Sequence, residues 1–418
     1  MVSVHIISIG NELLSGVTNT NASWLASQLF ANSIPVSKVH TIADEPKTLK
    51  KCLDEALAEA DIVITTGGLG PTVDDITKKV LCKYFNCGLK FSHSTYDNIE
   101  KLFNSRGLSV TQTNKKQAEI PEIAKPIPNI TGTAPGLWFN VNDKTLIALP
   151  GVPFEMHIMF SNFIVPELKN KYKLPKILSR TVLTHGLGES FLSDTIHKWE
   201  KQVPSFVKLA YLPSPGLVKI QLTGVDDANG MVKNTIDKLV TELQDIIPDY
   251  IFGYDHQTLQ ELTGSLLLAK KAKLSIAESC TGGFISHLMT SCPGSSEYYT
   301  GGVVAYDNDL KIRLLNIEKT LIEQFGAVSQ QVVEAMALNV RKLLKTDYSI
   351  ATTGIAGPGV GSKEKPVGTV WIAVATPHKL KSQKFRLGQN RQTNIVVAAH
   401  TALNMLRKIL AADVQEET

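Results

Sequence analysis

Cysteine is scarce in this chain, and the few cysteines form no pattern. Five occur in 418 residues, an odd number without metal-ligand spacing, so we expect reduced thiols and neither a disulfide framework nor a zinc site. No apolar run approaches the ~18 residues of a membrane span. The net charge is only +4 and is spread out, without the concentrated basic face of a nucleic-acid binder. The cysteines are Cys52, Cys82, Cys87, Cys280 and Cys292.

The first residues are equally free of targeting signals. They enter an apolar predicted strand at once, which leaves no signal peptide, and together with reduced thiols this predicts a cytoplasmic protein. Apolar residues make up 43% and charged residues 20% of the chain, the composition of ordinary globular domains. The length of 418 residues predicts two or three domains.

The most informative segment is residues 277–283, Ala-Glu-Ser-Cys-Thr-Gly-Gly. Residues 274–277 predict a short strand and residues 284–290 a helix, so Ser279 is expected where the strand turns into the helix. Free backbone N–H groups and the positive end of the helix dipole would lie near its hydroxyl. That position suits a nucleophile whose intermediate is an oxyanion. The alternative is that Ser279 and Thr281 only cap the helix.

A nucleophilic serine needs a base, and Lys311 is the best candidate. His287 is the one nearby histidine and belongs to the predicted helix, whereas Ser–Lys pairs are a known variant of the serine triad. A basic lysine must be neutral, hence desolvated or beside another cation. Tyr306, five residues earlier, could relay or hold its proton. The alternative is an ordinary solvated lysine.

Several further segments accompany this motif and together carry a resemblance. Over residues 257–410 the chain resembles the nicotinamide mononucleotide (NMN) deamidase family, the C-terminal half of the CinA (competence/damage-inducible) proteins. The resemblance implies hydrolysis of the NMN carboxamide to nicotinic acid mononucleotide and ammonia, without a cofactor. It implies Ser279 as nucleophile, ahead of Cys280, with Tyr306 and Lys311 as polar partners. The segments that carry it are 277–283, 293–296, 301–308, 326–329, 353–358 and 366–371. The implied substrate-binding residues are Thr281, Gly282, Gly283, Gly354, Gly357 and Arg391.

Two positions depart from that family pattern. Val360 replaces a usual glycine of the Gly357–Gly361 loop, where glycine permits positive φ and close approach to a ligand. Ile395 stands near the place of a usual second arginine, so Arg391 alone remains. Arg391 could hold the nucleotide phosphate bidentately. The alternative is an exposed arginine that begins the last helix.

Strands and helices alternate in the N-terminal part, which predicts a parallel sheet covered on both faces. The expected strands are 4–9, 36–42 and 61–66, and the expected helices 21–32 and 46–60. Glycine-rich segments follow the first and third strands, so they should converge where ligands bind such sheets. Asp74 and Asp75 beside these glycines would repel a bare phosphate, and a bridging divalent metal resolves that conflict. Alternatively, Asp74 caps a helix and Asp44 is a turn residue.

This part, residues 4–171, resembles the molybdopterin-binding domain of the molybdenum-cofactor proteins in the version found in CinA. The motifs are 65–77, 132–136 and 149–156. The resemblance implies metal-dependent cleavage of the pyrophosphate of ADP-ribose, with Mg, Mn or Co, and possibly K, as cofactor. Asp75 is the implied metal ligand, and Asn11 stands where some relatives have aspartate. The implied nucleotide site comprises Gly10, Asn11, Glu12, Asp44, Gly67, Gly68, Gly70, Thr72 and Asp75.

The segment between the two halves predicts a small α+β unit with a proline-glycine hairpin at Pro215-Gly216. In CinA relatives this region is KH-like. It has no Gly-x-x-Gly clamp, so RNA binding is not predicted. The expected α/β architecture therefore has a three-layer parallel-sheet domain (1–172), a KH-like α+β domain with a linker near 253–257 (173–256) and an α/β deamidase domain (257–418).

The leading hypothesis is a bifunctional hydrolase of pyridine-nucleotide salvage that acts on NMN and ADP-ribose. One alternative is a nucleotide transferase acting on molybdopterin, and another is a competence-linked scaffold that binds other proteins. We expect no nucleic-acid or membrane partner, and a homodimer, because soluble oligomers are most often twofold.

Overall fold

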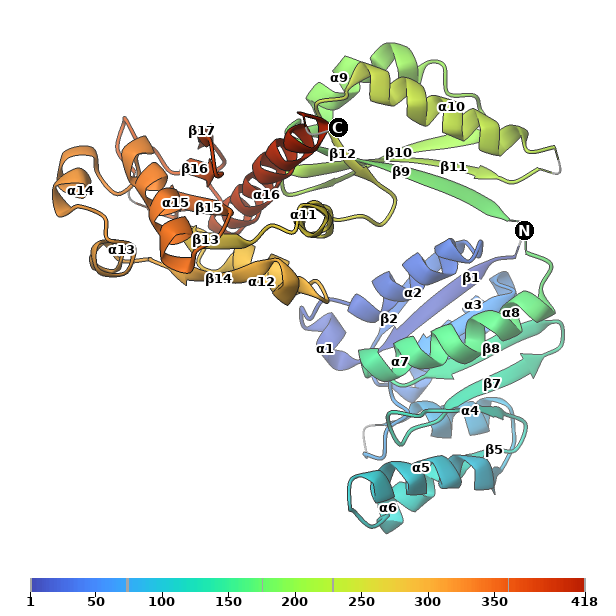
Figure 1. Ribbon diagram of the computed structural model, residues 1–418. Helices are drawn as coiled ribbons and strands as arrows, with labels where there is room; N and C mark the ends of the chain where they lie inside the picture. Colours follow the sequence, from blue (N-terminus) through green and yellow to red (C-terminus); the bar gives the residue numbers. More distant parts are fainter. Residues whose placement is uncertain (1, 73–74, 175, 228, 360, 417–418) are drawn as a thin grey trace. The chain divides into compact units, whose positions relative to one another are not determined.

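The computed structural model describes residues 2–72, 75–174, 176–227, 229–359 and 361–416 (Figure 1). Asp74 and Val360, for which the sequence made predictions, lie outside the described residues. The chain forms two compact units, Met1–Ile177 and Leu178–Thr418.

The first unit is built on a six-stranded sheet in the order β2-β1-β3-β8-β7-β6. Strands β2, β1, β3 and β8 are parallel, as the alternation of strands and helices predicted, whereas β7 and β6 are antiparallel additions. The strands are β1 (Val4–Ile9), β2 (Val36–Ile42), β3 (Ile62–Thr66), β6 (Lys125–Ile127), β7 (Gly136–Val141) and β8 (Lys144–Leu149).

Alternation along each strand gives this sheet two apolar faces. In β3, Ile62 and Ile64 face the core under α2, α7 and α8, and Val63 faces the core under α3 and α4. The sheet is therefore the middle of three layers. The helices are α1 (Asn11–Leu14), α2 (Thr20–Ala31), α3 (Pro46–Glu59), α4 (Thr77–Tyr84), α7 (Pro153–Met159), a π-helical turn η2 (Phe160–Ile164) and α8 (Val165–Lys171).

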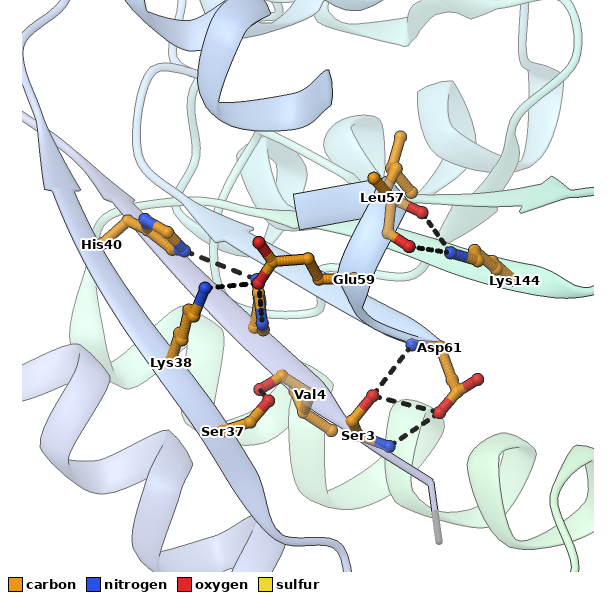
Figure 2. A network of polar contacts seen from close by, with 11 residues as sticks. Ser3, Val4, Ser37, Lys38, His40, Leu57, Glu59, Asp61 and Lys144 are labelled. Carbon is orange, nitrogen blue, oxygen red and sulfur yellow. Dashed lines mark hydrogen bonds and ion pairs between the residues drawn. The ribbon is translucent and has the colours of Figure 1, made fainter. Parts of the chain in front are cut away.

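Polar side chains tie together the amino ends of these strands (Figure 2). Ser3 donates its N–H to Asp61 Oδ2 at 2.8 Å, which joins the starts of β1 and β3. Lys144 donates to the carbonyls of Leu57 and Ala58 at the end of α3, where a cation is favourable. His5 is buried, and its burial and the neighbouring His40 lower its pKa. This network fixes the sheet edge opposite the expected ligand site.

An insertion between α4 and β6 forms a small lobe of its own. Its two strands pair antiparallel, and α4 packs against β5 (Figure 1). The elements are β4 (Leu89–Phe91), α5 (His93–Ser105), α6 (Gln112–Lys115), a 3-10 turn η1 (Lys116–Ala118) and β5 (Glu119–Pro121).

The second unit begins with a four-stranded sheet in the order β10-β11-β9-β12, packed against α9 and α10. The predicted hairpin is confirmed, since β10 and β11 pair antiparallel around Pro215 and Gly216. The elements are β9 (Ile177–His185), α9 (Glu189–Glu200), β10 (Val207–Ser214), β11 (Leu217–Val225), α10 (Met231–Ile246) and β12 (Ile251–Tyr254).

The rest of this unit is a five-stranded sheet in the order β14-β13-β15-β16-β17, with the first three strands parallel. Helix α15 covers one face, and α11, α12 and α16 cover the other. The strands are β13 (Leu274–Glu278), β14 (Tyr299–Val304), β15 (Tyr348–Gly354), β16 (Thr369–Ala375) and β17 (Leu380–Arg386). The helices are α11 (Leu259–Ala269), α12 (Phe284–Thr290), a 3-10 turn η3 (Ser295–Glu297), α13 (Asn308–Leu315), α14 (Lys319–Phe325), α15 (Gln330–Leu344) and α16 (Arg391–Glu416).

The expected linker at residues 253–257 is wrong in part, because its first residues are structural. Residues 251–254 form β12, which pairs with β9. Leu183 and Phe252 belong to the same buried core as Leu259 and Leu267 of α11. The two sheets of the second unit therefore share apolar residues, which a reading of local sequence did not reveal.

Helix α16 is long and apolar enough to cross a membrane by length and composition, counted over Arg391–Asp413. The expectation that no stretch comes near that length missed it, because polar residues interrupt the run. Half of the stretch is buried. Ala399, Leu403 and Leu406 lie in the core against α11 and the sheet, which accounts for the apolar composition.

Candidate functional site

Ser279 lies at the predicted strand-to-helix turn. It follows the last residue of β13, donates its N–H to the carbonyl of Thr352 at 3.0 Å and is 8% exposed. Gly282 and Gly283 have φ values of +60° and +97°, a left-handed turn that favours glycine, and α12 begins directly after them. The serine hydroxyl is thus held by a fixed turn at the carboxyl edge of the sheet.

The neighbouring strand delivers Tyr306 and Lys311 to the same edge. Strand β14 runs parallel to β13 with Val304 opposite Glu278, and Ala305 donates its N–H to the carbonyl of Glu278 at 2.8 Å. Residues that directly follow two adjacent parallel strands emerge side by side. The residues after β14 therefore lie beside Ser279.

Lys311 is buried, with 1% of its surface exposed. Its Nζ donates to the carbonyl oxygens of Ala305 at 2.9 Å and Tyr306 at 3.1 Å. Burial lowers the pKa of this ammonium group, although the carboxylate of Asp307 opposes the shift. A neutral amine has two N–H groups, which match the two carbonyls, and one lone pair that is left to accept a proton. The alternative of a solvated lysine is wrong.

Tyr306 has a different partner from the one we expected. Its side chain is 57% exposed, and its hydroxyl accepts a hydrogen bond from Arg391 Nη2 at 2.8 Å. It is the backbone carbonyl of Tyr306, as described above, that meets Lys311. Arg391 also donates from Nη1 to the carbonyl of Gly357 at 2.8 Å, so it is not merely an exposed residue at the start of α16. The structure brings Tyr306, Gly357 and Arg391 together.

The backbone N–H groups that begin α12 are not free, contrary to expectation. Glu278 is fully buried, and its carboxylate accepts hydrogen bonds from the N–H groups of Gly283 at 3.0 Å, Ile285 at 3.1 Å and Ser286 at 2.8 Å. The hydroxyl of Ser286 adds a fourth at 2.7 Å. These donors and the helix dipole stabilise the buried charge. Sequence reasoning missed Glu278, although an acidic residue just before a helix start was the available signal.

Cys280 is less suited to be the nucleophile than its neighbour. It is buried, and this burial raises the pKa of its thiol to about 12, so the reactive thiolate is disfavoured. A Cβ on Gly354 would lie 3.1 Å from the Cys280 sulfur, so that glycine permits close packing. Thr281 is also buried and shares a hydrogen bond of 2.8 Å with the hydroxyl of Thr352. In this structure, therefore, Gly354 packs against Cys280, and the Thr281 hydroxyl is hydrogen-bonded to Thr352.

Asn394 is a second residue that sequence reasoning missed. It is buried one turn into α16 and donates from Nδ2 to the carbonyls of Ala356 and Gly388, both at 2.9 Å. These bonds hold the loop that presents Gly357 to Arg391. Ile395, the departure from the family pattern, is half-buried beside it.

In the first unit, a cleft of about 350 Å³ lies at the carboxyl ends of β1, β3 and β8. The predicted convergence of the two glycine-rich segments is confirmed. Asn11 is next to the cleft and donates its N–H to Asp44 Oδ2 at 2.9 Å, whereas Thr72 lines a neighbouring cavity. Of the predicted site residues, the cleft is lined by Gly10, Glu12, Asp44, Gly67, Gly68, Gly70 and Asp75.

The carboxylates of this cleft fit a metal ion that takes only one or two protein ligands. Asp75 accepts hydrogen bonds from the N–H groups of Gly70 and Thr72, both at 2.8 Å, so fewer of its oxygen lone pairs remain for a metal ion. Within the described ranges, no group of three or more His, Cys, Asp or Glu side chains is arranged to hold a metal ion. Mg²⁺ commonly takes one or two carboxylates and completes its shell with phosphate and water oxygens. Asp44 and Asp75 fit that role, and an all-protein metal cage is not present among these residues.

The protein is thus of the mixed α/β class: its first unit is built on a largely parallel sheet, and its second unit has a serine at a strand-to-helix turn and a buried lysine. Three family models match in the same order: the probable molybdopterin binding domain at residues 5–170, the damage-inducible protein CinA KH domain at 179–253 and the CinA C-terminal domain at 256–410.

The chain belongs to the CinA family. It is 41% identical over 410 residues to a CinA-like protein of Cytophaga hutchinsonii, covering 98% of each chain. It is 43% identical over 408 residues to a CinA-like protein of Flavobacterium psychrophilum, covering 96% of this chain and 97% of the relative. A crystal structure of a CinA superfamily protein from Klebsiella pneumoniae is 30% identical and covers 37% of this chain and 99% of its own, with a TM-score of 0.36.

Proposed function

We propose that the second unit hydrolyses the carboxamide of NMN and releases nicotinic acid mononucleotide and ammonia. The observation that carries this proposal is Lys311: a buried amine with a lowered pKa and two carbonyl partners, at the sheet edge where Ser279 emerges. Amide hydrolysis by a serine requires a base that takes the hydroxyl proton, and an amine can do so only in its neutral form.

In this mechanism, Ser279 Oγ attacks the carboxamide carbon while Lys311 Nζ accepts the hydroxyl proton. The tetrahedral intermediate then collapses: the C–N bond breaks, and the proton returns from Lys311 to the leaving nitrogen as ammonia departs. Water attacks the resulting ester with Lys311 again as base, which releases the carboxylic acid and restores the serine. Each step conserves protons between the serine, the lysine and the leaving group.

Arg391 binds the phosphate of the substrate in this proposal. A guanidinium has five N–H donors, and the bonds to Gly357 and Tyr306 use two of them. The remaining donors can bind phosphate oxygens in a charge-assisted pair. The exposed ring of Tyr306 offers a face to the cationic pyridinium ring.

The test is ammonia release from NMN by the purified full chain and its variants. Ser279→Ala should lower turnover by orders of magnitude while circular dichroism shows an intact fold, and Cys280→Ala, the matched control, should be nearly silent. An active Ser279→Ala together with an inactive Cys280→Ala would make this a thiol enzyme. A folded wild-type chain that releases no ammonia would favour the scaffold or the molybdopterin transferase.

We further propose that the first unit cleaves the pyrophosphate of ADP-ribose, because its cleft combines glycine-rich loops with carboxylates at the sheet edge. A divalent cation, when bound, would neutralise phosphate charge there, and Asp75 and Asp44 would hold it. Glu12 and Glu155 line the same cleft, and in this proposal one of them accepts the proton of an attacking water.

Both Asp75→Ala and EDTA should abolish AMP release from ADP-ribose and leave ammonia release from NMN unchanged. Ammonia release serves as the internal control for folding of the second unit. Cleavage of ADP-ribose that persists in EDTA would contradict the metal dependence.

A further inference from the structure

Two of the five cysteines, Cys82 and Cys87, lie at the carboxyl end of α4, where the chain passes into the small lobe formed by residues 89–121 (Figure 1). Both are free thiols, and both side chains are partly exposed. Both also line a cavity of about 420 Å³. The two thiols therefore border a space that small solutes can enter.

The backbone brings these two cysteines together. Cys87 donates its N–H to the carbonyl of Cys82 at 3.0 Å, and Asn86 donates its N–H to the carbonyl of Lys83 at 3.3 Å. Asn86 has a φ of +46°, the left-handed conformation that ends a helix in a Schellman motif. In this motif the side chains of the residues joined by the outer hydrogen bond commonly touch. Cys82 and Cys87 occupy those two positions.

The spacing of the two residues suits a disulfide. A disulfide needs Cα atoms about 4.4–6.8 Å apart. Residues joined by a backbone hydrogen bond lie in that range, as opposed residues of antiparallel strands do at about 5.5 Å. The thiols also influence each other, since the pKa of Cys82 is raised to about 11, first by burial and then by the charge of Cys87 and a hydrogen bond with its thiol.

The turn that carries this pair connects α4 to the small lobe. Gly88, directly after Cys87, accepts the N–H of Glu122 at 2.9 Å and donates its own N–H to the Glu122 carboxylate at 3.2 Å. Glu122 directly follows β5 of the lobe. At the other end of α4, Thr77 donates its N–H to the carbonyl of Gly68 in the glycine-rich loop at 3.0 Å. A covalent bond across the turn would therefore fix the joint between α4 and the lobe.

We propose that Cys82 and Cys87 are a redox-active dithiol that low-molecular-weight disulfides of the glutathione type oxidise reversibly to an intramolecular disulfide. The modification closes the turn covalently and locks the joint between α4 and the small lobe. It is independent of both proposed hydrolytic activities, because neither thiol takes part in them.

The oxidation proceeds by two thiol–disulfide exchanges. The thiolate of one cysteine attacks a sulfur of the added disulfide, which breaks its S–S bond, releases one small thiol and leaves a mixed disulfide on the protein. The thiolate of the other cysteine then attacks the protein sulfur of that mixed disulfide and releases the second small thiol. Two protein S–H bonds are lost and one S–S bond forms, while the added disulfide takes up both electrons and both protons.

The test is equilibration of the folded full chain in buffers of oxidised and reduced glutathione, followed by blocking of free thiols and digestion with trypsin. Trypsin cleaves after Lys79, Lys83 and Lys90, so the two cysteines fall in separate peptides, 80–83 and 84–90. Only a disulfide holds these peptides together, at a mass two hydrogens below their sum. We expect the joined peptides in oxidising buffer and their separation on reduction.

Folding should favour this disulfide. The equilibrium constant for its formation should be at least roughly tenfold higher in the folded chain than in urea, which corresponds to about 30 mV. Asn86→Gly keeps the left-handed turn and should match wild type, whereas Asn86→Val disfavours the turn and should lose most of this gain. Cys292→Ser, the matched control at another partly exposed thiol, should keep the joined peptides, and Cys87→Ser should abolish them.

Cysteines that stay free in oxidising buffer, or that carry only separate mixed disulfides with glutathione, would overturn the proposal. An equal equilibrium constant in the folded chain and in urea would do the same, because the turn would then not prepare the pair. Both measurements use the wild-type chain, so they remain decisive if a substitution disturbs the fold.

Discussion

Arg391 donates a hydrogen bond from Nη2 to the hydroxyl oxygen of Tyr306 at 2.8 Å, across 85 residues of sequence. The same guanidinium holds the carbonyl of Gly357, so three separate loops meet at one side chain. Arginine suits this position because its planar fork presents several donors in fixed directions. A lysine carries its three donors on one atom and could not reproduce this planar fork.

Replacement of Arg391 should mainly weaken substrate binding. Arg391→Lys keeps the charge but loses the fork, so we expect KM for NMN to rise roughly tenfold or more, with a smaller change in kcat. Tyr306→Phe, which removes only the hydroxyl, is the control for loss of the internal bond and should have a weaker effect. Steady-state ammonia release measures both. An unchanged KM in Arg391→Lys would remove Arg391 from the phosphate site.

Lys311 should give the proposed NMN hydrolysis a pH profile with an ascending limb. The neutral amine is the active form, so kcat/KM should rise with pH through its lowered pKa and level off above it, below the usual range of lysine. Lys311→Ala should lose orders of magnitude in turnover, and Lys311→Arg should not restore it, because guanidinium stays protonated. Combining Ser279→Ala with Lys311→Ala should cost little more than either alone.

The lowered pKa of Lys311 also predicts how the stability of the fold depends on pH. The unfolded chain binds a proton at Lys311 where the folded chain does not, so the free energy of unfolding should rise with pH between the folded and unfolded pKa values. Chemical unfolding at several pH values, compared between wild type and Lys311→Met, measures this contribution. For the activity profile described in the preceding paragraph, an ascending limb of kcat/KM that persists in a still-active Lys311 variant would contradict the assignment of Lys311 as the base.

His185 should make the second unit sensitive to acid. It is buried between Thr401 and Asn404 at 3.2 and 3.1 Å. Burial, with His400, Lys408 and Arg407 nearby, lowers its pKa from 6.5 to about 4. As pH falls through that interval the unfolded chain gains a proton first, so stability should fall by about 3 kcal/mol in total and change no further below it. His185→Gln should flatten this dependence in urea unfolding; an identical profile would contradict it.

A fragment that begins near Gln257 should keep deamidase activity, because Ser279, Lys311 and Arg391 all lie within it. It should be less stable than the full chain, since Leu183 and Phe252 contribute to the core that it retains. Turnover and thermal unfolding of the fragment and the full chain are the measurements. A soluble, folded but inactive fragment would show that the site is not self-contained.

The sequence predicted those features that depend on local periodicity. Val4–Ile9 and Val36–Ile42 form strands with the predicted bounds, because apolar and β-branched residues leave few alternatives. Ser279 is at its predicted turn because two adjacent glycines mark it. Features that depend on packing between distant segments could not be predicted from the sequence. Whether Lys311 is solvated or buried depends on how α13 meets the sheet, and the sharing of Phe252 with α11 is a long-range contact.

If the second unit takes a phosphate-bearing substrate, as proposed, Glu278 affects how that substrate is attracted from solution. Its carboxylate neutralises the positive end of α12 from inside the protein, so that helix contributes little outward field. Long-range attraction then depends on a side chain that reaches solvent, and Arg391 is such a cation, half-buried at the start of α16. The rate of substrate capture should accordingly follow ionic strength through side-chain charge such as that of Arg391 and not through a fixed backbone dipole.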